Sequence, residues 1–171
     1  MRSIAVTLLC GFIGSPSVAL AAPELIPEEA MQNVLVGRTA PDFDAQQADG
    51  QAFKLSETRG KPVLLTFWAS WCGPCRAELP DLSDYQKAHP ELSIFAVNVD
   101  RERRKAEGFL RQVSFDLPIV WDTDSQAMGQ YDVLSMPTMF LLDANGTLKW
   151  RKTGYSRANG FKELDAALEA L

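Results

Sequence analysis

The sequence predicts an α/β fold with a central mixed β-sheet flanked by helices. Three short apolar runs predict buried strands over residues 62–68, 92–99 and 137–142. Segments with helical patterning lie between and after these runs. This alternation of strands and helices along 171 residues is typical of one layered domain.

The first expected element is a β-hairpin over residues 42–55. An Asp-Gly dipeptide at its centre favours a tight turn. The first buried run then leads into a helix expected over residues 72–87. Pro80 lies inside that helix, and we expect a kink there because proline removes a backbone hydrogen bond.

The stretch between the second and third runs is longer than one crossover helix requires. We expect Asp100 to cap a helix over residues 103–112. A short strand over 117–120 and one or two helical turns over 125–131 complete this stretch.

The last part of the chain returns along the sheet. A turn at residues 143–146 predicts an antiparallel strand over 147–153. We then expect Asn159 to cap a final amphipathic helix. Its apolar stripe comprises Phe161, Leu164, Leu168 and Leu171.

The N-terminus has the order of a secretory signal peptide. A positive start precedes an apolar run over residues 4–13, and an Ala-Leu-Ala cleavage site ends at Ala21. That run is about half the length of a membrane-spanning helix. We therefore expect a cleaved signal, with an uncleaved membrane anchor as the alternative.

The expected organisation is a signal peptide over 1–21, a leader over 22–35 and one domain over 36–171. The protein is then periplasmic or otherwise extracytoplasmic, or anchored to the membrane if the signal is retained. Such a compartment is oxidising, so disulfides can persist there.

The formal net charge of −5 argues against a nucleic-acid partner, which normally requires a basic surplus. We expect a monomer. A basic run at Arg101 and residues 103–105 is expected to be a solvated face, with a docking patch as the alternative.

The chemical motif is a Trp-Cys-Gly-Pro-Cys pentapeptide over residues 71–75. It follows a buried strand and begins a helix, where the helix dipole stabilises a thiolate. Cys72 is expected to be exposed at the helix tip as the attacking nucleophile. Cys75 is expected to be more buried and to resolve the mixed disulfide.

Metal binding and simple cross-linking are the alternatives for this pair. A zinc site needs four ligands, but the sequence has no second CxxC and its sole histidine is His89. A Cu(I) site made by the two thiolates is chemically possible. A passive disulfide would close a loop too short to stabilise much. We expect dithiol–disulfide exchange, without a metal or a cofactor.

The stretch Thr66-Phe-Trp-Ala-Ser-Trp-Cys-Gly-Pro-Cys75 resembles the active site of thioredoxin-fold proteins. The wider pattern resembles the TlpA/ResA branch of exported thiol–disulfide oxidoreductases. Its further marks are Gly37–Phe43, Val97–Asp100, Asp122–Asp124, Tyr131–Val133 and Met136–Thr138. The resemblance implies a thioredoxin-like fold with an N-terminal hairpin and a central insertion that helps shape the client surface.

The resemblance also implies roles for a loop near the cysteines. Pro137 is the expected cis-proline opposite Cys72, and the Met136 backbone is expected to pair with an extended client segment. The implied client-binding residues are Trp71, Gly73, Pro74, Met136, Pro137 and Thr138.

Glu78 is the implied proton-handling acid, because an acid at this place in the ResA-like branch lies near the cysteines. A solvated surface charge is the alternative. Thioredoxin has a buried aspartate where this chain has Thr66, which carries no titratable proton. Glu78 is therefore the nearest candidate for that task.

The resemblance implies a reductant of client disulfides, because Gly-Pro between the cysteines is similar to the reducing thioredoxins. Implied partners are clients with disulfides or CxxC motifs, in cytochrome c maturation or copper-protein assembly, and a membrane thiol electron donor. The alternatives are a Cu(I)-handling assembly protein and a thiol peroxidase. The CxxC arrangement does not resemble the peroxidase layout.

Overall fold

The computed structural model describes residues 35–171. The expected signal peptide, and the expected leader up to residue 34, lie outside these residues. Within residues 35–171, no helix combines the length and apolar character needed to cross a bilayer.

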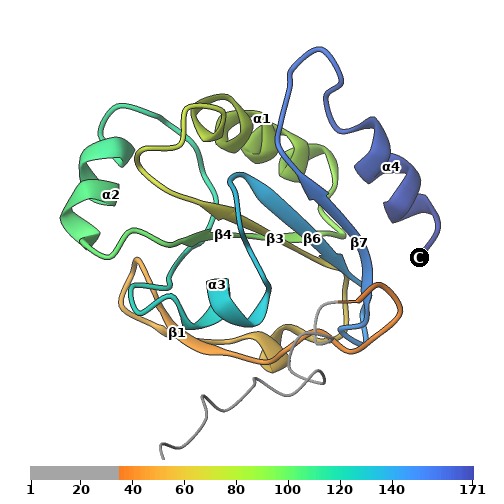
Figure 1. The fold of residues 1–171 in the computed structure, drawn as a ribbon. Coiled ribbons are helices and arrows are strands. Elements are labelled where there is room, and N and C mark those ends of the chain that lie inside the picture. The colour runs from red at the N-terminus through yellow and green to blue at the C-terminus, as the bar shows by residue number, and fades with distance from the viewer. Residues whose placement is uncertain (1–34) are drawn as a thin grey trace, which may run out of the picture.

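A seven-stranded sheet forms the centre of the molecule, in the order β2-β1-β5-β4-β3-β6-β7 (Figure 1). Strand β3 pairs in parallel with β4 and antiparallel with β6, which confirms the mixed sheet. The hairpin β1–β2 joins the sheet through β5. The strands are β1 (Asp44–Gln47), β2 (Ala52–Lys54), β3 (Val63–Trp68), β4 (Ser93–Asn98), β5 (Ile119–Trp121), β6 (Thr138–Leu142) and β7 (Leu148–Thr153).

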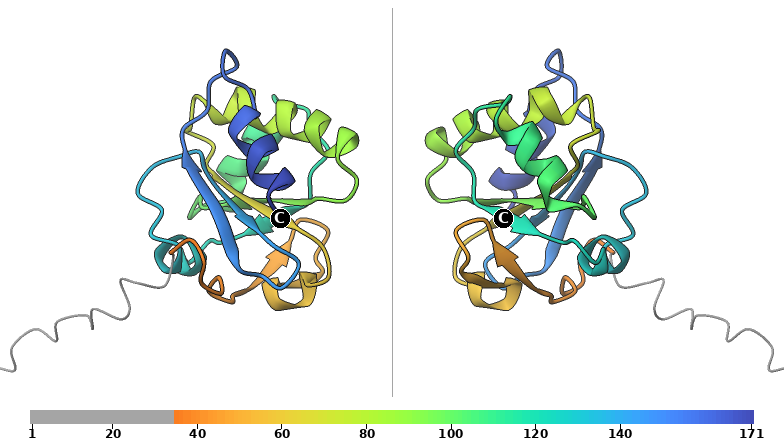
Figure 2. Two further views of the ribbon diagram at one scale, coloured as in Figure 1. Left: turned by 90° about the vertical axis from the view of Figure 1, so that its right-hand side faces the viewer. Right: turned by 90° about the vertical axis from the view of Figure 1, so that its left-hand side faces the viewer.

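Helices cover both faces of the sheet (Figure 2). Three of them, α1, α2 and α4, lie on one face, while α3 and the short helix η2 lie on the other. The predicted layered α/β architecture is thus confirmed. The helices are η2 (Leu55–Thr58), α1 (Cys75–Ala88), α2 (Arg103–Leu110), α3 (Gln126–Gln130) and α4 (Lys162–Glu169).

Strand β3 has apolar packing on both faces, which explains why Thr66 is the one polar residue in its sequence. Leu64 and Trp68 belong to the core under α1, α2 and α4. Leu65 and Phe67 belong to the opposite core, which is closed by the hairpin and α3. All six residues of β3 are buried. The strand therefore provides a rigid base for the loop that follows it.

Two expected helix caps are wrong. The residue before α2 is Glu102, which makes no capping hydrogen bond through its side chain. The carboxylate of Asp100 instead accepts hydrogen bonds from Ser70 and Asn98. The residue before α4 is Phe161, not Asn159, because the chain from Ser156 first makes a separate turn.

Helix α1 begins at Cys75, later than expected, and continues through Pro80. The bend expected at Pro80 stays a prediction. In α4, Leu164 is buried, whereas Leu171 lies beyond the end of the helix and is 43% exposed. The predicted apolar stripe therefore ends before the C-terminal residue.

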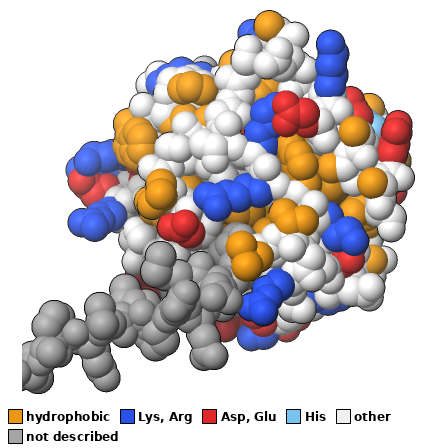
Figure 3. All heavy atoms as spheres, turned by 45° about the vertical axis from the view of Figure 1, so that its right-hand side comes forward, with side chains coloured by type: hydrophobic (Ala, Val, Ile, Leu, Met, Phe, Trp, Pro, Cys, Tyr) orange, Lys and Arg blue, Asp and Glu red, His pale blue; other side chains and the backbone are white. Residues whose placement is uncertain are grey.

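The face shown in Figure 3 carries side chains of both charges, interspersed with hydrophobic ones. Exposed pairs such as Lys87–Asp84 contribute little to stability because water screens them. The negative net charge is thus not concentrated in one acidic patch on this face.

Candidate active site

Cys72 and Cys75 form a disulfide where β3 gives way to α1. Cys75 is fully buried and Cys72 is 4% exposed. The expectation that Cys72 would be exposed is therefore wrong in degree, although it is the more accessible of the two. The neighbouring Trp71 is 69% exposed and stands at the edge of the site. Gly73 and Pro74 are also exposed, so the dipeptide between the cysteines lies at the surface.

The start of α1 presents a backbone donor to sulfur. The Cys75 N–H donates a hydrogen bond of 3.2 Å to the Sγ of Cys72. Pro74 precedes the helix with φ −61°, already suited to helix entry, and it has no N–H to satisfy. After reduction, the same donor and the helix dipole would stabilise a thiolate on Cys72.

A buried hydrogen-bond network holds the loop before Cys72. The Asp100 carboxylate accepts from the Ser70 N–H at 2.7 Å and from the Ser70 hydroxyl at 2.8 Å. Asn98 donates to the same carboxylate at 2.9 Å. The end of β4 thereby fixes the loop that follows β3. The sequence signal was the Asn-Val-Asp run itself, which the helix-cap interpretation misassigned.

Glu78 is fully buried one turn after Cys75, on the side of α1 that faces the sheet. Its Oε1 accepts a hydrogen bond of 3.1 Å from the hydroxyl of Thr66, on β3. Its Oε2 has no hydrogen-bond partner among the described residues. Burial raises the pKa of Glu78 to about 8, and the Thr66 hydrogen bond opposes part of that rise. The alternative of a solvated surface charge is therefore wrong.

A second loop lies against the disulfide region. The Met136–Pro137 peptide bond is cis, as expected. Met136 is half-buried and packs against the core cluster that contains both cysteines. The Gly154 N–H donates to the Pro137 carbonyl at 2.7 Å, which ties this loop to the end of β7.

Thr138 takes a different position from the rest of this loop. Its side chain is fully buried, and its hydroxyl donates to the Ser135 carbonyl at 2.7 Å. Thr138 therefore stabilises the loop from its buried side. Its expected part in client binding stays a prediction, and it would act through the backbone or through the loop's shape.

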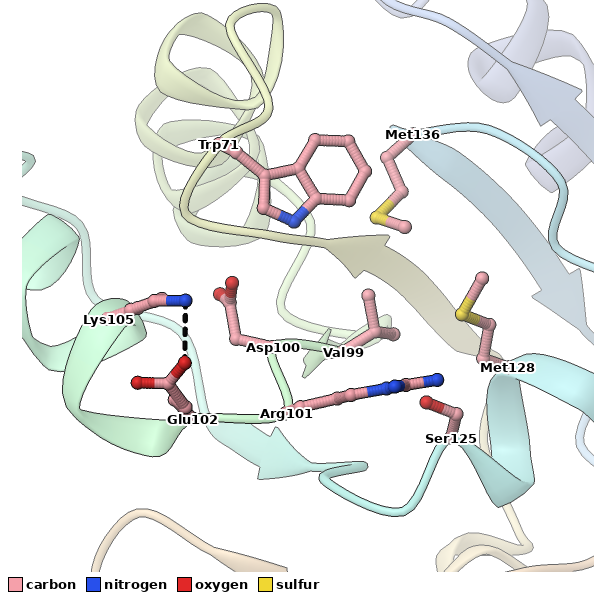
Figure 4. Close-up of a pocket in the computed structure, with 9 residues that line it drawn as sticks. All are labelled: Trp71, Val99, Asp100, Arg101, Glu102, Lys105, Ser125, Met128 and Met136. Carbon is pink, nitrogen blue, oxygen red and sulfur yellow. Dashed lines mark ion pairs between the residues drawn. The ribbon is translucent and has the colours of Figure 1, made fainter.

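A groove of about 460 Å³ opens between these loops (Figure 4). Trp71 and Met136 face each other across its upper part, while Arg101 stretches along its lower part towards Ser125 and Met128. The sequence did not predict this groove, because three segments far apart in the chain build it. Its lining residues are Trp71, Val99, Asp100, Arg101, Glu102, Lys105, Ser125, Met128 and Met136.

Five of the nine predicted site residues fall into three groups. Trp71 and Met136 line the groove, Cys72 and Cys75 form the disulfide beside it, and Glu78 lies beneath in the core. Among residues 35–171, no group of three or more His, Cys, Asp or Glu side chains is arranged to hold a metal ion. The two sulfurs and the buried Glu78 carboxyl group are the reactive groups that the predicted site brings together.

Comparisons with known proteins agree with this site. The model of the AhpC/TSA family matches residues 36–151. The thiol-disulfide oxidoreductase ResA of Geobacillus thermodenitrificans is 39% identical over 134 residues, covering 76% of each chain. The ResA protein of Bacillus subtilis is 34% identical over 125 residues, covering 72% of this chain and 70% of the relative.

A solved structure supports the same relationship. A Chlorobium tepidum protein assigned as the thiol:disulfide interchange protein DsbE superposes with a TM-score of 0.75 at 35% identity. The superposition covers 80% of this chain and 97% of that one. The segment matched by the family model contains both cysteines and the cis-proline loop. The chain therefore belongs to the AhpC/TSA family, as a thioredoxin-like thiol–disulfide oxidoreductase.

Proposed function

We propose that this protein is an exported reductant, which passes electrons from its Cys72/Cys75 dithiol to disulfides in client proteins. The proposed clients are CxxC sites in cytochrome c maturation or thiols of copper proteins. The observation that carries the proposal is the Cys72–Cys75 disulfide at the start of α1, beside a groove large enough for a peptide segment. The Gly-Pro dipeptide between the cysteines favours the reducing direction.

The first step is attack on the client by Cys72. The Cys72 thiolate forms a bond to one client sulfur, the client S–S bond breaks, and one client thiolate leaves. The Cys75 N–H and the dipole of α1 stabilise the attacking thiolate. The Met136 backbone would hold an extended client segment alongside the groove.

The second step is resolution by Cys75. Its thiol loses a proton, attacks the Sγ of Cys72 and releases the second client thiolate. Two electrons have then moved from the protein dithiol to the client disulfide, and the protein ends in the oxidised form that the structure describes. We propose that Glu78 takes the Cys75 proton. This role is supported by the position of both residues on α1, one turn apart, and by the burial of the carboxyl group.

A protein that reduces disulfides in an oxidising compartment must have its own Cys72–Cys75 disulfide reduced again after each cycle. We propose a membrane-bound thiol donor, which reverses the two exchange steps and restores the dithiol. Export through the signal peptide over residues 1–21, or anchoring by it, would place the protein beside such a donor. The protein is proposed to act as a monomer.

A trapping experiment tests the proposed function. Cys75→Ala, expressed in the source cell, should hold the client on Cys72 as a mixed disulfide that survives non-reducing electrophoresis. Cys72→Ala is the matched control, because it lacks the attacking sulfur. Failure to recover any mixed disulfide specific to Cys75→Ala would count against the proposal, and so would a reduction potential as high as that of a dedicated oxidase.

Cu(I) handling is the second candidate function. The observation that favours it is the thioether of Met136, packed against the cluster that contains both cysteines, since thiolates and thioethers are soft ligands for Cu(I). This function predicts tight Cu(I) binding by the reduced protein and weak disulfide reductase activity. Competition for Cu(I) against a chromogenic chelator, with the reductase rate measured on the same sample, separates the two functions.

A further inference from the structure

The groove beside the disulfide contains one cation that forms no ion pair with another described residue. Arg101 lines the groove and is exposed. Within residues 35–171, its guanidinium group makes neither an ion pair nor a side-chain hydrogen bond. Figure 4 shows it extended along the groove, with its head between Val99, Met128 and Ser125.

The other charges around the groove are already engaged. Lys105 forms an ion pair with Glu102 at 2.7 Å, marked by the dashed line in Figure 4. Glu102 also lies 3.9 Å from Arg104, outside the groove. The Asp100 carboxylate is buried and receives hydrogen bonds from Ser70 and Asn98. The four charged side chains of the groove lining therefore sum to zero, and among them Arg101 is the one whose charged group has neither an ion pair nor a hydrogen bond within the described residues.

Apolar side chains lie in the part of the groove opposite this cation. They are Trp71, the neighbour of Cys72 in the chain, and Met136, which packs against the cluster that contains both cysteines (Figure 4). A second hollow of about 240 Å³ shares Ser125 and Met128 with the groove and continues it to Leu134, which is 84% exposed. The lining of this second hollow includes Asp132. A carboxylate on the client is thus attracted by Arg101 at one end and repelled by Asp132 at the end near Leu134.

We propose that the groove selects extended client segments that carry an apolar side chain next to the target cysteine and a carboxylate that reaches Arg101. This inference rests on the proposed function and adds the class of client. Trp71 and Met136 contact the apolar side chain while the cysteine lies against the disulfide region, and Arg101 pairs with the Asp or Glu side chain. The central stretch between β4 and β6 thereby acts as the specificity element, because it supplies Arg101, Ser125 and Met128.

The test uses short peptides closed by one internal disulfide and the reduced full chain. The peptides differ only in carrying Asp, Asn or Lys, placed in turn at successive positions on either side of one cysteine. The second-order rate of peptide reduction is followed by thiol alkylation and mass spectrometry. At the position that reaches Arg101, Asp should react about three- to fivefold faster than Asn, with Lys slowest, as expected for one partly exposed ion pair. Raising the salt concentration should shrink this preference.

Two variants localise the effect. Arg101→Glu should invert the order of the Asp and Lys peptides. Arg104→Glu makes the same charge change in the same basic run, but Arg104 is 88% exposed in its side chain and does not line the groove. It should keep the wild-type order.

Equal rates for the three peptides at every position would overturn the inference, as would an equal effect of the two variants. In both cases the proposed function stands, since the peptides are still reduced. If the wild-type dithiol reduces none of the peptides, the proposed function and the inference built on it both fall.

Discussion

The hydroxyl of Thr66 donates a 3.1 Å hydrogen bond to Oε1 of Glu78 across the buried junction of β3 and α1. This single contact joins the strand before the cysteines to the helix after them. It gives the buried carboxyl group one polar partner, while its other oxygen has none within the described part of the chain. The proton affinity of Glu78 therefore depends on very few groups.

Replacing Glu78 with Gln should flatten the pH dependence of the dithiol reaction. Burial raises the pKa of Glu78 to about 8, so the carboxylate that accepts a proton from Cys75 becomes abundant only around and above that pH. The rate of mixed-disulfide resolution should rise with pH in the wild type and lose that rise in Glu78→Gln, with a slowing of about 10²-fold at high pH. Rapid-mixing kinetics across pH measure it. Glu57→Gln, at an exposed acid on η2, is the control and should match the wild type. Identical pH profiles for Glu78→Gln and wild type would remove Glu78 from the proton path.

The same residue should make the stability of the oxidised protein depend on pH. The folded state keeps the Glu78 proton up to about pH 8, whereas an unfolded Glu releases it near 4.5. The folded state therefore binds more protons between these values, and its free energy of unfolding falls as pH rises through this window. Urea denaturation at a series of pH values should show the fall in wild type and a smaller one in Glu78→Gln. An unchanged slope in the variant would contradict the assignment.

Replacing Thr66 with Val keeps the shape of the side chain and removes the donor. The Thr66 hydrogen bond lowers the pKa of Glu78, so its loss should raise that pKa further. A hydrogen bond of about 1 kcal/mol corresponds to a shift of roughly one pH unit or less in the kinetic profile. Thr66→Ser retains the hydroxyl and should restore the wild-type profile. If Thr66→Val lowered stability without shifting the kinetic pH profile, Thr66 would contribute only to packing and not to the pKa of Glu78.

Replacing Asp100 with Ala should destabilise the protein by about 2–4 kcal/mol, because it leaves buried donors of Ser70 and Asn98 without their acceptor. The loop before Cys72 should also lose its fixed position, so client reduction slows. Equilibrium urea unfolding of the oxidised form measures the first effect. Asp84→Ala removes an exposed carboxylate, 79% exposed in its side chain, and should change stability by less than about 0.5 kcal/mol. Similar losses in both variants would refute the buried network.

Much of the sheet was predictable because its strands are coded locally. The runs behind β3, β4 and β6 are mostly apolar, as two-sided burial favours. The hairpin turn at Asp49-Gly50 was equally local, and Gly50 adopts the positive φ of 89° that such a turn needs. These elements depend on nearest neighbours in the sequence, so the sequence reveals them.

Features that depend on distant contacts were predicted less well. Asp100 was assigned to a helix cap because the nearest helix in the sequence offered its only evident hydrogen-bond donors. In the structure, the Asp100 carboxylate instead accepts a hydrogen bond from Ser70, thirty residues earlier. The exposure of Cys72 was overestimated because nothing in the pentapeptide reveals the covering segments. The groove was missed for the same reason, since Trp71 and Arg101 come from two separate loops and Met128 comes from α3. Glu78 was the exception, because the family resemblance had implied an acid near the cysteines at this place, and the structure buries it on the side of α1 that faces the sheet.

The double pairing of β3 has a consequence for how the molecule opens. Neighbouring strands hydrogen-bond to β3 on both sides along nearly its whole length, whereas β2 and β7 each have one open edge. Amide hydrogens of β3 should thus exchange with solvent only when the whole domain unfolds, after those at the edges have begun to exchange. The cysteine-bearing loop is attached to the last part of the protein to open. Local unfolding of the edge strands β2 and β7 should therefore leave the geometry of the two cysteines unchanged.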